Sequence, residues 1–163
     1  MSAVLSPCGA YRYRLDRNTG LFADGPQVCW IMVNPSTADA ETDDTTIRKV
    51  RGFTERMGFN RFVVGNLFAF RATDVRQLKA MADPVGPENH IHLADMIAAA
   101  DRVIFAWGAS GKLPRQWHDQ FLLISTLVSG RPEKGPFAFG RCNDGHPRHP
   151  LMTPYHEPLE RWV

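Results

Sequence analysis

The residues best suited to chemistry follow apolar runs, where strands of a sheet would end. Val28 to Val33 is an unbroken apolar run that stops at Asn34-Pro35-Ser36, and Asn66 interrupts a second run from Arg61 to Phe70. A buried amide costs free energy unless it is hydrogen-bonded, so Asn66 bonds either the backbone or a ligand. The turn at Asn34 is typical either of a ligand site or of a simple strand end followed by helix caps.

Two later segments carry polar or small residues in similar positions. Phe105-Ala106-Trp107-Gly108 ends a third apolar run, and a fourth segment from Arg141 to Leu151 is rich in His and Arg. The carboxyl ends of parallel strands lie along one edge of a sheet, so these segments are expected to converge on one cleft. His146 and His149 are equally compatible with an ordinary surface loop.

Three carboxylates follow the first turn. Asp39, Asp43 and Asp44 could hold a divalent metal or supply a general base that acts on a nucleotide. Carboxylates near a helix start also cap the helix by bonding its first backbone amides.

The elements that would position these residues alternate between strands and helices. Apolar periodicity predicts helices at about 44–57, 88–100 and 114–129, with strands at 28–33, 61–70 and 102–111. This order predicts a single domain, residues 1–163, with a three-layer α/β/α fold and a central, mainly parallel sheet. The alternation from Tyr11 to Leu15 predicts an edge strand with one solvated face.

Composition describes an ordinary globular chain of 163 residues, 44% of them apolar, with a formal net charge of +2. No apolar run reaches the roughly 20 residues that span a bilayer, and the N-terminus lacks the layout of a signal peptide, so we expect a cytoplasmic protein with no membrane partner. Cys8, Cys29 and Cys142 lack metal-site spacing, and we expect neither a metal nor another cofactor.

Several motifs resemble known families. The stretches 34–39, 43–48, 66–73 and 147–151 (N-P-S-T-A-D, D-D-T-T-I-R, N-L-F-A-F-R-A-T and P-R-H-P-L) resemble the DUF1643 family of bacterial proteins over nearly the whole chain. The order of the motifs also resembles the uracil-DNA glycosylase superfamily, whose fold the chain is therefore expected to share. Val33 to Ser36 is most similar to the G-x-N-P-G motif of the mismatch-specific branch, although Met32 stands in place of the usual Gly.

The glycosylase resemblance implies hydrolysis of the N-glycosidic bond of a modified or mismatched base that has left the stack. It implies that Asn34 holds the attacking water, Asn66 binds the base edge and His149 donates to the developing base anion. The remaining implied substrate contacts are the turn residue Pro35, stacking by Phe68 or Trp107, and phosphate binding by Ser36, Arg141 and Arg148. Aromatic residues such as Phe68 and Trp107 are more often core residues than stacking groups.

DNA or a nucleotide is the expected partner. Five basic side chains are expected to flank the cleft as a basic rim: Arg48, Lys49, Arg51, Arg141 and Arg148. Asn34 stands where the uracil-specific branch has the carboxylate that activates the water. An amide is no strong base, so the sequence does not decide whether the chain is an enzyme. The alternatives are a non-catalytic module of the same fold that binds nucleic acid or a nucleotide, and a metal-dependent nucleotide hydrolase that uses Asp39, Asp43 and Asp44.

Overall fold

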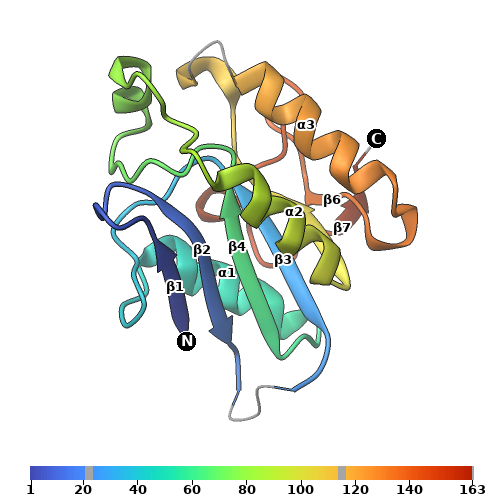
Figure 1. Cartoon of the computed structure of the whole chain (residues 1–163). Coiled ribbons are helices and arrows are strands. Elements are labelled where there is room, and N and C mark those ends of the chain that lie inside the picture. Colours follow the sequence, from blue (N-terminus) through green and yellow to red (C-terminus); the bar gives the residue numbers. More distant parts are fainter. Residues whose placement is uncertain (21–23, 114–116, 163) are drawn as a thin grey trace.

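A computed structural model of the chain describes residues 1–20, 24–113 and 117–162. Within these residues seven strands form one mixed sheet in the order β1-β2-β4-β3-β5-β6-β7 (Figure 1). Their bounds are β1 (Ser2–Leu5), β2 (Arg12–Asn18), β3 (Gln27–Met32), β4 (Arg61–Asn66), β5 (Arg102–Phe105), β6 (Phe137–Phe139) and β7 (Leu159–Arg161).

The expectation of a mainly parallel sheet is not confirmed. Among the described strands the pairings β4–β3, β3–β5 and β5–β6 are parallel, whereas β1–β2, β2–β4 and β6–β7 are antiparallel. The alternation of strands and helices reveals only the central pairings, because crossover helices link parallel strands. The antiparallel outer strands carry no such signal, and β1 and β7 are too short to stand out in the sequence.

The described helices lie where apolar periodicity predicts them. They are α1 (Thr45–Arg56), α2 (Asn89–Ala99) and α3 (Trp117–Ser129), with short 3-10 segments η1 (Val75–Ala80), η2 (Ser110–Lys112), η3 (Pro132–Lys134) and η4 (Pro150–Met152). The predicted start of the third helix at 114 lies outside the described residues. No helix in the described part of the chain has the length and apolar character needed to cross a membrane.

Helices cover both faces of the sheet. Ile47, Val50 and Phe53 of α1 pack in one buried cluster with residues of the central strands. Leu93 of α2 and Ile124 of α3 belong to a second buried cluster on the opposite face. Figure 1 shows α1 on one side of the sheet and α2 and α3 on the other. The protein is therefore a mixed α/β structure with a core on each side of its sheet.

Strand β2 differs from the expected edge strand. It lies between β1 and β4, and its residues Arg12, Tyr13, Leu15 and Arg17 are buried. Alternation of Arg and Tyr predicted a solvated face because arginine is rarely buried without a partner. The buried arginines instead bond groups from the loop that follows β3, which lies far away in the sequence.

The register of the central strands determines where the loops begin. Strands β3 and β4 pair in parallel with Met32 opposite Asn66, the last residue of each strand. Beyond them, the backbone N–H of Leu67 donates to the carbonyl of Met32, and that of Phe68 donates to Val33. The polar residues that follow β3 and end β4 are thus held at the same edge of the sheet.

The assignment of α2 to the second cluster can be tested on two residues of that helix. Leu93 is 0% exposed and Ile91 is 65% exposed. Leu93→Ala should lower the free energy of unfolding by about 2–5 kcal/mol, because it removes buried apolar volume. Ile91→Ala, the matched control, should change it by less than about 0.5 kcal/mol. Urea unfolding measures both, and equal losses would contradict this orientation of α2.

Candidate functional site

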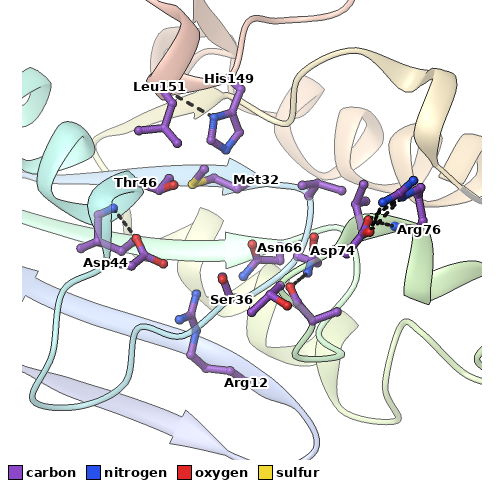
Figure 2. A pocket seen from close by; sticks show the side chains of 16 residues that line it. Arg12, Met32, Ser36, Asp44, Thr46, Asn66, Asp74, Arg76, His149 and Leu151 are labelled. Carbon is purple, nitrogen blue, oxygen red and sulfur yellow. Dashed lines mark hydrogen bonds and ion pairs between the residues drawn. The ribbon is translucent and has the colours of Figure 1, made fainter.

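A cavity of about 680 Å³ lies where the carboxyl ends of β3 and β4 meet the start of α1 (Figure 2). Its wall contains the expected residues Asn34, Ser36, Asn66 and His149. It also contains Val33 of the same motif as Asn34 and Asp44, a candidate carboxylate, together with residues that were not expected there: Arg12, Met32, Thr46, Ile47, Ala72, Thr73, Asp74, Val75, Arg76 and Leu151. The structure thus brings the two amides and the histidine together, as the strand-end argument predicts.

Asn66 presents a buried amide to this cavity. The side chain is only 2% exposed, and its Nδ2 has no hydrogen-bond partner among the described residues. The neighbouring amide of Asn89 donates from Nδ2 to the backbone carbonyl of Asn66 at 3.0 Å. Buried polar groups are almost always satisfied, so a free amide in a cavity wall favours a ligand over a backbone partner.

Asn34 is held by two backbone acceptors. Its Nδ2 donates to the carbonyl oxygen of Ala72 at 2.7 Å and to that of Pro35 at 3.0 Å. Both bonds need the amide nitrogen, and they fix the orientation of the side chain. The group that Asn34 can offer a ligand or a water is therefore its carbonyl oxygen, an acceptor.

His149 offers the opposite kind of group. Its Nδ1 accepts a hydrogen bond from the backbone N–H of Leu151 at 3.3 Å, so a neutral ring carries its proton on Nε2. Burial lowers the pKa of His149 below 6.5, and the opposing attraction of Asp44 is smaller. The ring is therefore neutral at pH 7, and Figure 2 shows it pointing into the cavity.

Arg12 is a buried cation of the cavity wall that the sequence did not reveal. The residue is 3% exposed, and its Nη1 donates to the carbonyl oxygen of Ala38 at 2.6 Å. Its buried Nε has no partner, and no carboxylate in the described part of the chain forms an ion pair with it. Burial lowers the pKa of Arg12 to about 10. No sequence signal separates it from Arg14, which lies on the same strand and pairs with Asp16.

Other expected substrate residues lie outside the cavity wall. Phe68 and Trp107 are buried in the core cluster beneath α2 and α3, where neither can stack on a ligand in the cavity. The indole Nε1–H of Trp107 donates to Nδ1 of His146 at 3.3 Å. Pro35 acts through its backbone carbonyl, which accepts from the amide of Asn34. Phe68 and Trp107 are therefore core residues rather than stacking groups of the cavity.

The expected basic rim does not line the cavity either. Lys49 lies over the ring of Tyr155, 3.7 Å from its centroid, and Arg141 lies 4.0 Å from that of Trp162. Arg148 donates to the carbonyl of Arg141 and pairs with Glu157 at 3.3 Å. Arg48 and Arg51 bond groups around Asp43. These side chains therefore mainly contact the protein itself.

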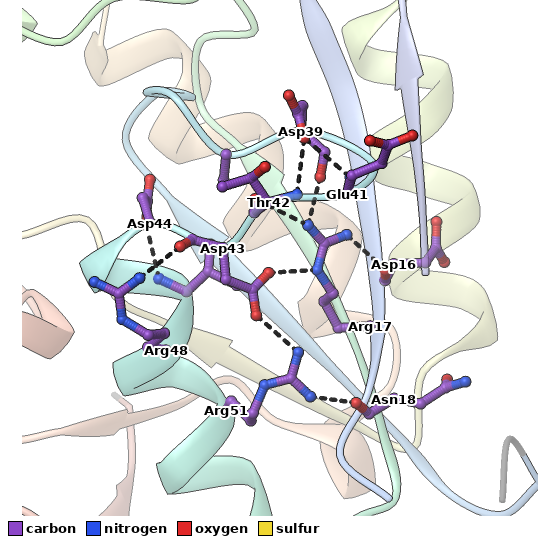
Figure 3. Close-up of polar contacts among 12 residues, drawn as sticks. Asp16, Arg17, Asn18, Asp39, Glu41, Thr42, Asp43, Asp44, Arg48 and Arg51 are labelled. Carbon is purple, nitrogen blue, oxygen red and sulfur yellow. Dashed lines mark hydrogen bonds and ion pairs between the residues drawn. The ribbon is translucent and has the colours of Figure 1, made fainter. Parts of the chain in front are cut away.

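The three carboxylates after β3 serve different partners (Figure 3). Asp39 accepts from the backbone N–H groups of Glu41 and Thr42, and Asp44 caps α1 by accepting from Ile47. The carboxylate of Asp43 pairs with Arg17 at 2.6 Å and with Arg51 at 2.7 Å. No cluster of three or more His, Cys, Asp or Glu side chains within the described ranges is arranged to hold a metal ion. The geometry thus gives the metal-dependent alternative no support.

Comparison with known proteins identifies the family. Many α/β proteins have a cavity at one edge of the sheet, so the fold alone does not identify the family. The sequence does. Residues 12–151 match the family described as "Protein of unknown function (DUF1643)", and the chain belongs to this family. No curated protein and no solved structure matches the chain. The glycosylase resemblance therefore depends on the motifs themselves.

The Asp43 ion pairs predict a pH-dependent stability. Burial raises the pKa of Asp43, but its bonds to Arg51 and Arg17 outweigh that effect and lower it below 3.8. The stabilisation is therefore fully present above pH 3.8 and is lost as the pH falls through the lowered pKa. Asp43→Asn should cost about 3–5 kcal/mol at pH 7, because the buried Arg17 loses its counter-charge, and should flatten this acid dependence.

Urea unfolding at pH 7 and at acidic pH checks both effects. The control is Asp74→Asn, which alters the exposed pair with Arg76 and should cost at most about 1 kcal/mol. Equal losses in the two variants at pH 7 would show that the Asp43 pairs are not structural.

Proposed function

We propose that the cavity binds a nucleobase and that the protein is a DNA glycosylase-like hydrolase acting on an N-glycosidic bond. The unpartnered amide of Asn66 is the observation that carries this proposal. An amide presents a donor and an acceptor side by side, and this pair matches the hydrogen-bonding edge of a base. A base of the wrong pattern would leave the buried amide unpaired at a cost of about 1–3 kcal/mol, which supplies specificity.

His149 and Asn34 could stabilise the charges that develop during cleavage of an N-glycosidic bond. Cleavage makes the sugar cationic and the departing base anionic. The neutral Nε2–H of His149 can donate to the base as its negative charge develops. The carbonyl oxygen of Asn34 can accept a hydrogen bond from the attacking water and so orient it, although an amide is no strong base.

The cavity also has a suitable size and wall. About 680 Å³ lies within the range of sites for small organic ligands. Met32, Ile47 and Leu151 give the wall apolar faces on which a planar base can rest, in place of the buried Phe68 and Trp107. A cleft at the carboxyl edge of a partly parallel sheet with helices on both faces supports the uracil-DNA glycosylase-like architecture as part of the same proposal.

A second candidate is a non-catalytic module that binds a nucleobase without releasing it. It is favoured by the environment of Asn34, whose nitrogen is bonded to the backbone and whose remaining group is not a base. The two candidates share the base pocket and differ only in turnover.

One experiment tests the pocket and separates the candidates. Nucleotides and oligonucleotides that carry normal, deaminated or alkylated bases are incubated with the protein, and binding and free base are measured by calorimetry and chromatography. We expect one base to bind and to be released. Binding without release would identify the recognition module, and no binding of any base would reject the pocket.

The matched variant is Asn66→Leu, which replaces the amide by an apolar group of similar size. It should abolish base binding while leaving the melting temperature unchanged or higher, because a buried unpaired amide is removed. A structural amide would give the reverse pattern, with stability lost and base binding kept.

A further inference from the structure

Two buried arginines of β2 differ sharply in their partners. Arg17 donates from Nε to Asp43, from Nη1 to two backbone carbonyls and from Nη2 to the carbonyl of Asp39 (Figure 3). Among the described residues the side chain of Arg12 makes one hydrogen bond, from Nη1 to the carbonyl of Ala38, and Arg12 lines the cavity. A buried cation is normally paired, because removing it from water costs several kcal/mol. The environment of Arg17 accounts for its charge, whereas that of Arg12 does not.

A second cation lies close to Arg12. The charge of Arg71 helps to lower the pKa of Arg12, as two nearby guanidinium groups repel each other. The buried Nε of Arg71 also has no partner, and its Nη1 makes a single bond to the carbonyl of Gly9 at 3.3 Å. Asp44 attracts Arg12 more strongly than Arg71 repels it, and Asp39 attracts it weakly, but neither carboxylate forms an ion pair with Arg12 within the described residues.

Ser36 lines two neighbouring cavities, one together with Arg12 and the other together with Arg71. The main cavity, which Arg12 lines, and a neighbouring cavity of about 410 Å³, which Arg71 lines, share Ser36, Ala72 and Thr73. A ligand group beside Ser36 is therefore at the boundary of the two cavities, one lined by Arg12 and the other by Arg71. In Figure 2 the Arg12 side chain extends toward Ser36.

We propose that Arg12, Arg71 and Ser36 form an anion subsite that binds the phosphate of a mononucleotide, while Asn66 binds its base. The inference rests on the proposed function and narrows its substrate to a free nucleotide rather than DNA. Guanidinium groups bind phosphate through charge-assisted hydrogen bonds and match its geometry.

Charge and enclosure favour a terminal phosphate. A phosphate monoester carries about 1.5 to 2 negative charges at pH 7, and a backbone diester carries one. Two guanidinium groups therefore match the monoester better. Of the residues expected to contact phosphate groups, Ser36 lines the cavity, whereas the basic rim of Arg48, Lys49, Arg51, Arg141 and Arg148 does not. The enclosed position of Arg12, 3% exposed, suits a small ligand that enters the cavity whole.

The test compares ligands on the wild-type protein by calorimetry. A nucleoside 5′-monophosphate should bind at least about tenfold more tightly than its nucleoside, since a hydrogen bond to a charged group contributes about 1.5–3 kcal/mol and 1.4 kcal/mol is tenfold. Inorganic phosphate should raise the melting temperature above that in chloride of equal ionic strength. An oligonucleotide without a terminal phosphate should bind more weakly than the mononucleotide.

Variants assign the effect to the subsite. Arg12→Gln keeps a donor for Ala38 but should abolish the preference for nucleotide over nucleoside. Arg71→Gln, at a less buried position, should reduce the preference and serves if the first variant does not fold. Arg48→Gln removes one positive charge outside the cavity and should leave the preference unchanged.

The outcomes distinguish this inference from the proposed function. Equal binding of nucleotide and nucleoside would overturn the anion subsite while leaving the base pocket intact, and tighter binding of the oligonucleotide would overturn the choice of a mononucleotide. If nucleotides with different bases bind equally tightly, and Asn66→Leu binds them as tightly as the wild type, the subsite is supported and the proposed function is rejected.

Discussion

The parallel pairing of β3 with β4 is the constraint on which the site depends. Met32 and Asn66 face each other at the last register position, so the chain leaves both strands at one level. The loop after β3 then passes over the end of β4, where Asn34 bonds the carbonyl of Ala72. A shift of one residue would turn the amide of Asn66 to the other face of the sheet and remove it from the cavity.

The loop between β3 and α1 is held by charges that come from β2. Arg17 bonds Asp43 and the carbonyl of Asp39, and Arg12 bonds the carbonyl of Ala38. Asp44 then starts α1 by capping its first turn. The same strand therefore supplies Arg17, whose guanidinium bonds this loop and other backbone carbonyls, and Arg12, whose guanidinium bonds only the carbonyl of Ala38 among the described residues and which lines the cavity.

The convergence of Asn34, Asn66 and His149 was predictable because apolar runs mark buried strands and their polar ends mark one sheet edge. Strands β3 and β4 and helices α1 and α2 followed from the same periodicity. Burial of Arg12 was not predictable, because its contacts come from a loop far along the chain and local alternation cannot show them. Phe68 and Trp107 have the residue types of stacking groups, and only tertiary packing shows them to be core residues.

We propose that one cavity binds a base at Asn66 and a phosphate at Arg12, and a crystal structure of the protein with a nucleoside 5′-monophosphate would show whether it does. We expect the side-chain amide of Asn66 within about 2.7–3.2 Å of polar atoms on the base edge, and the phosphate against the guanidinium of Arg12. A nucleotide bound elsewhere, or bound with its base away from Asn66, would show that Asn66 and Arg12 do not form this site.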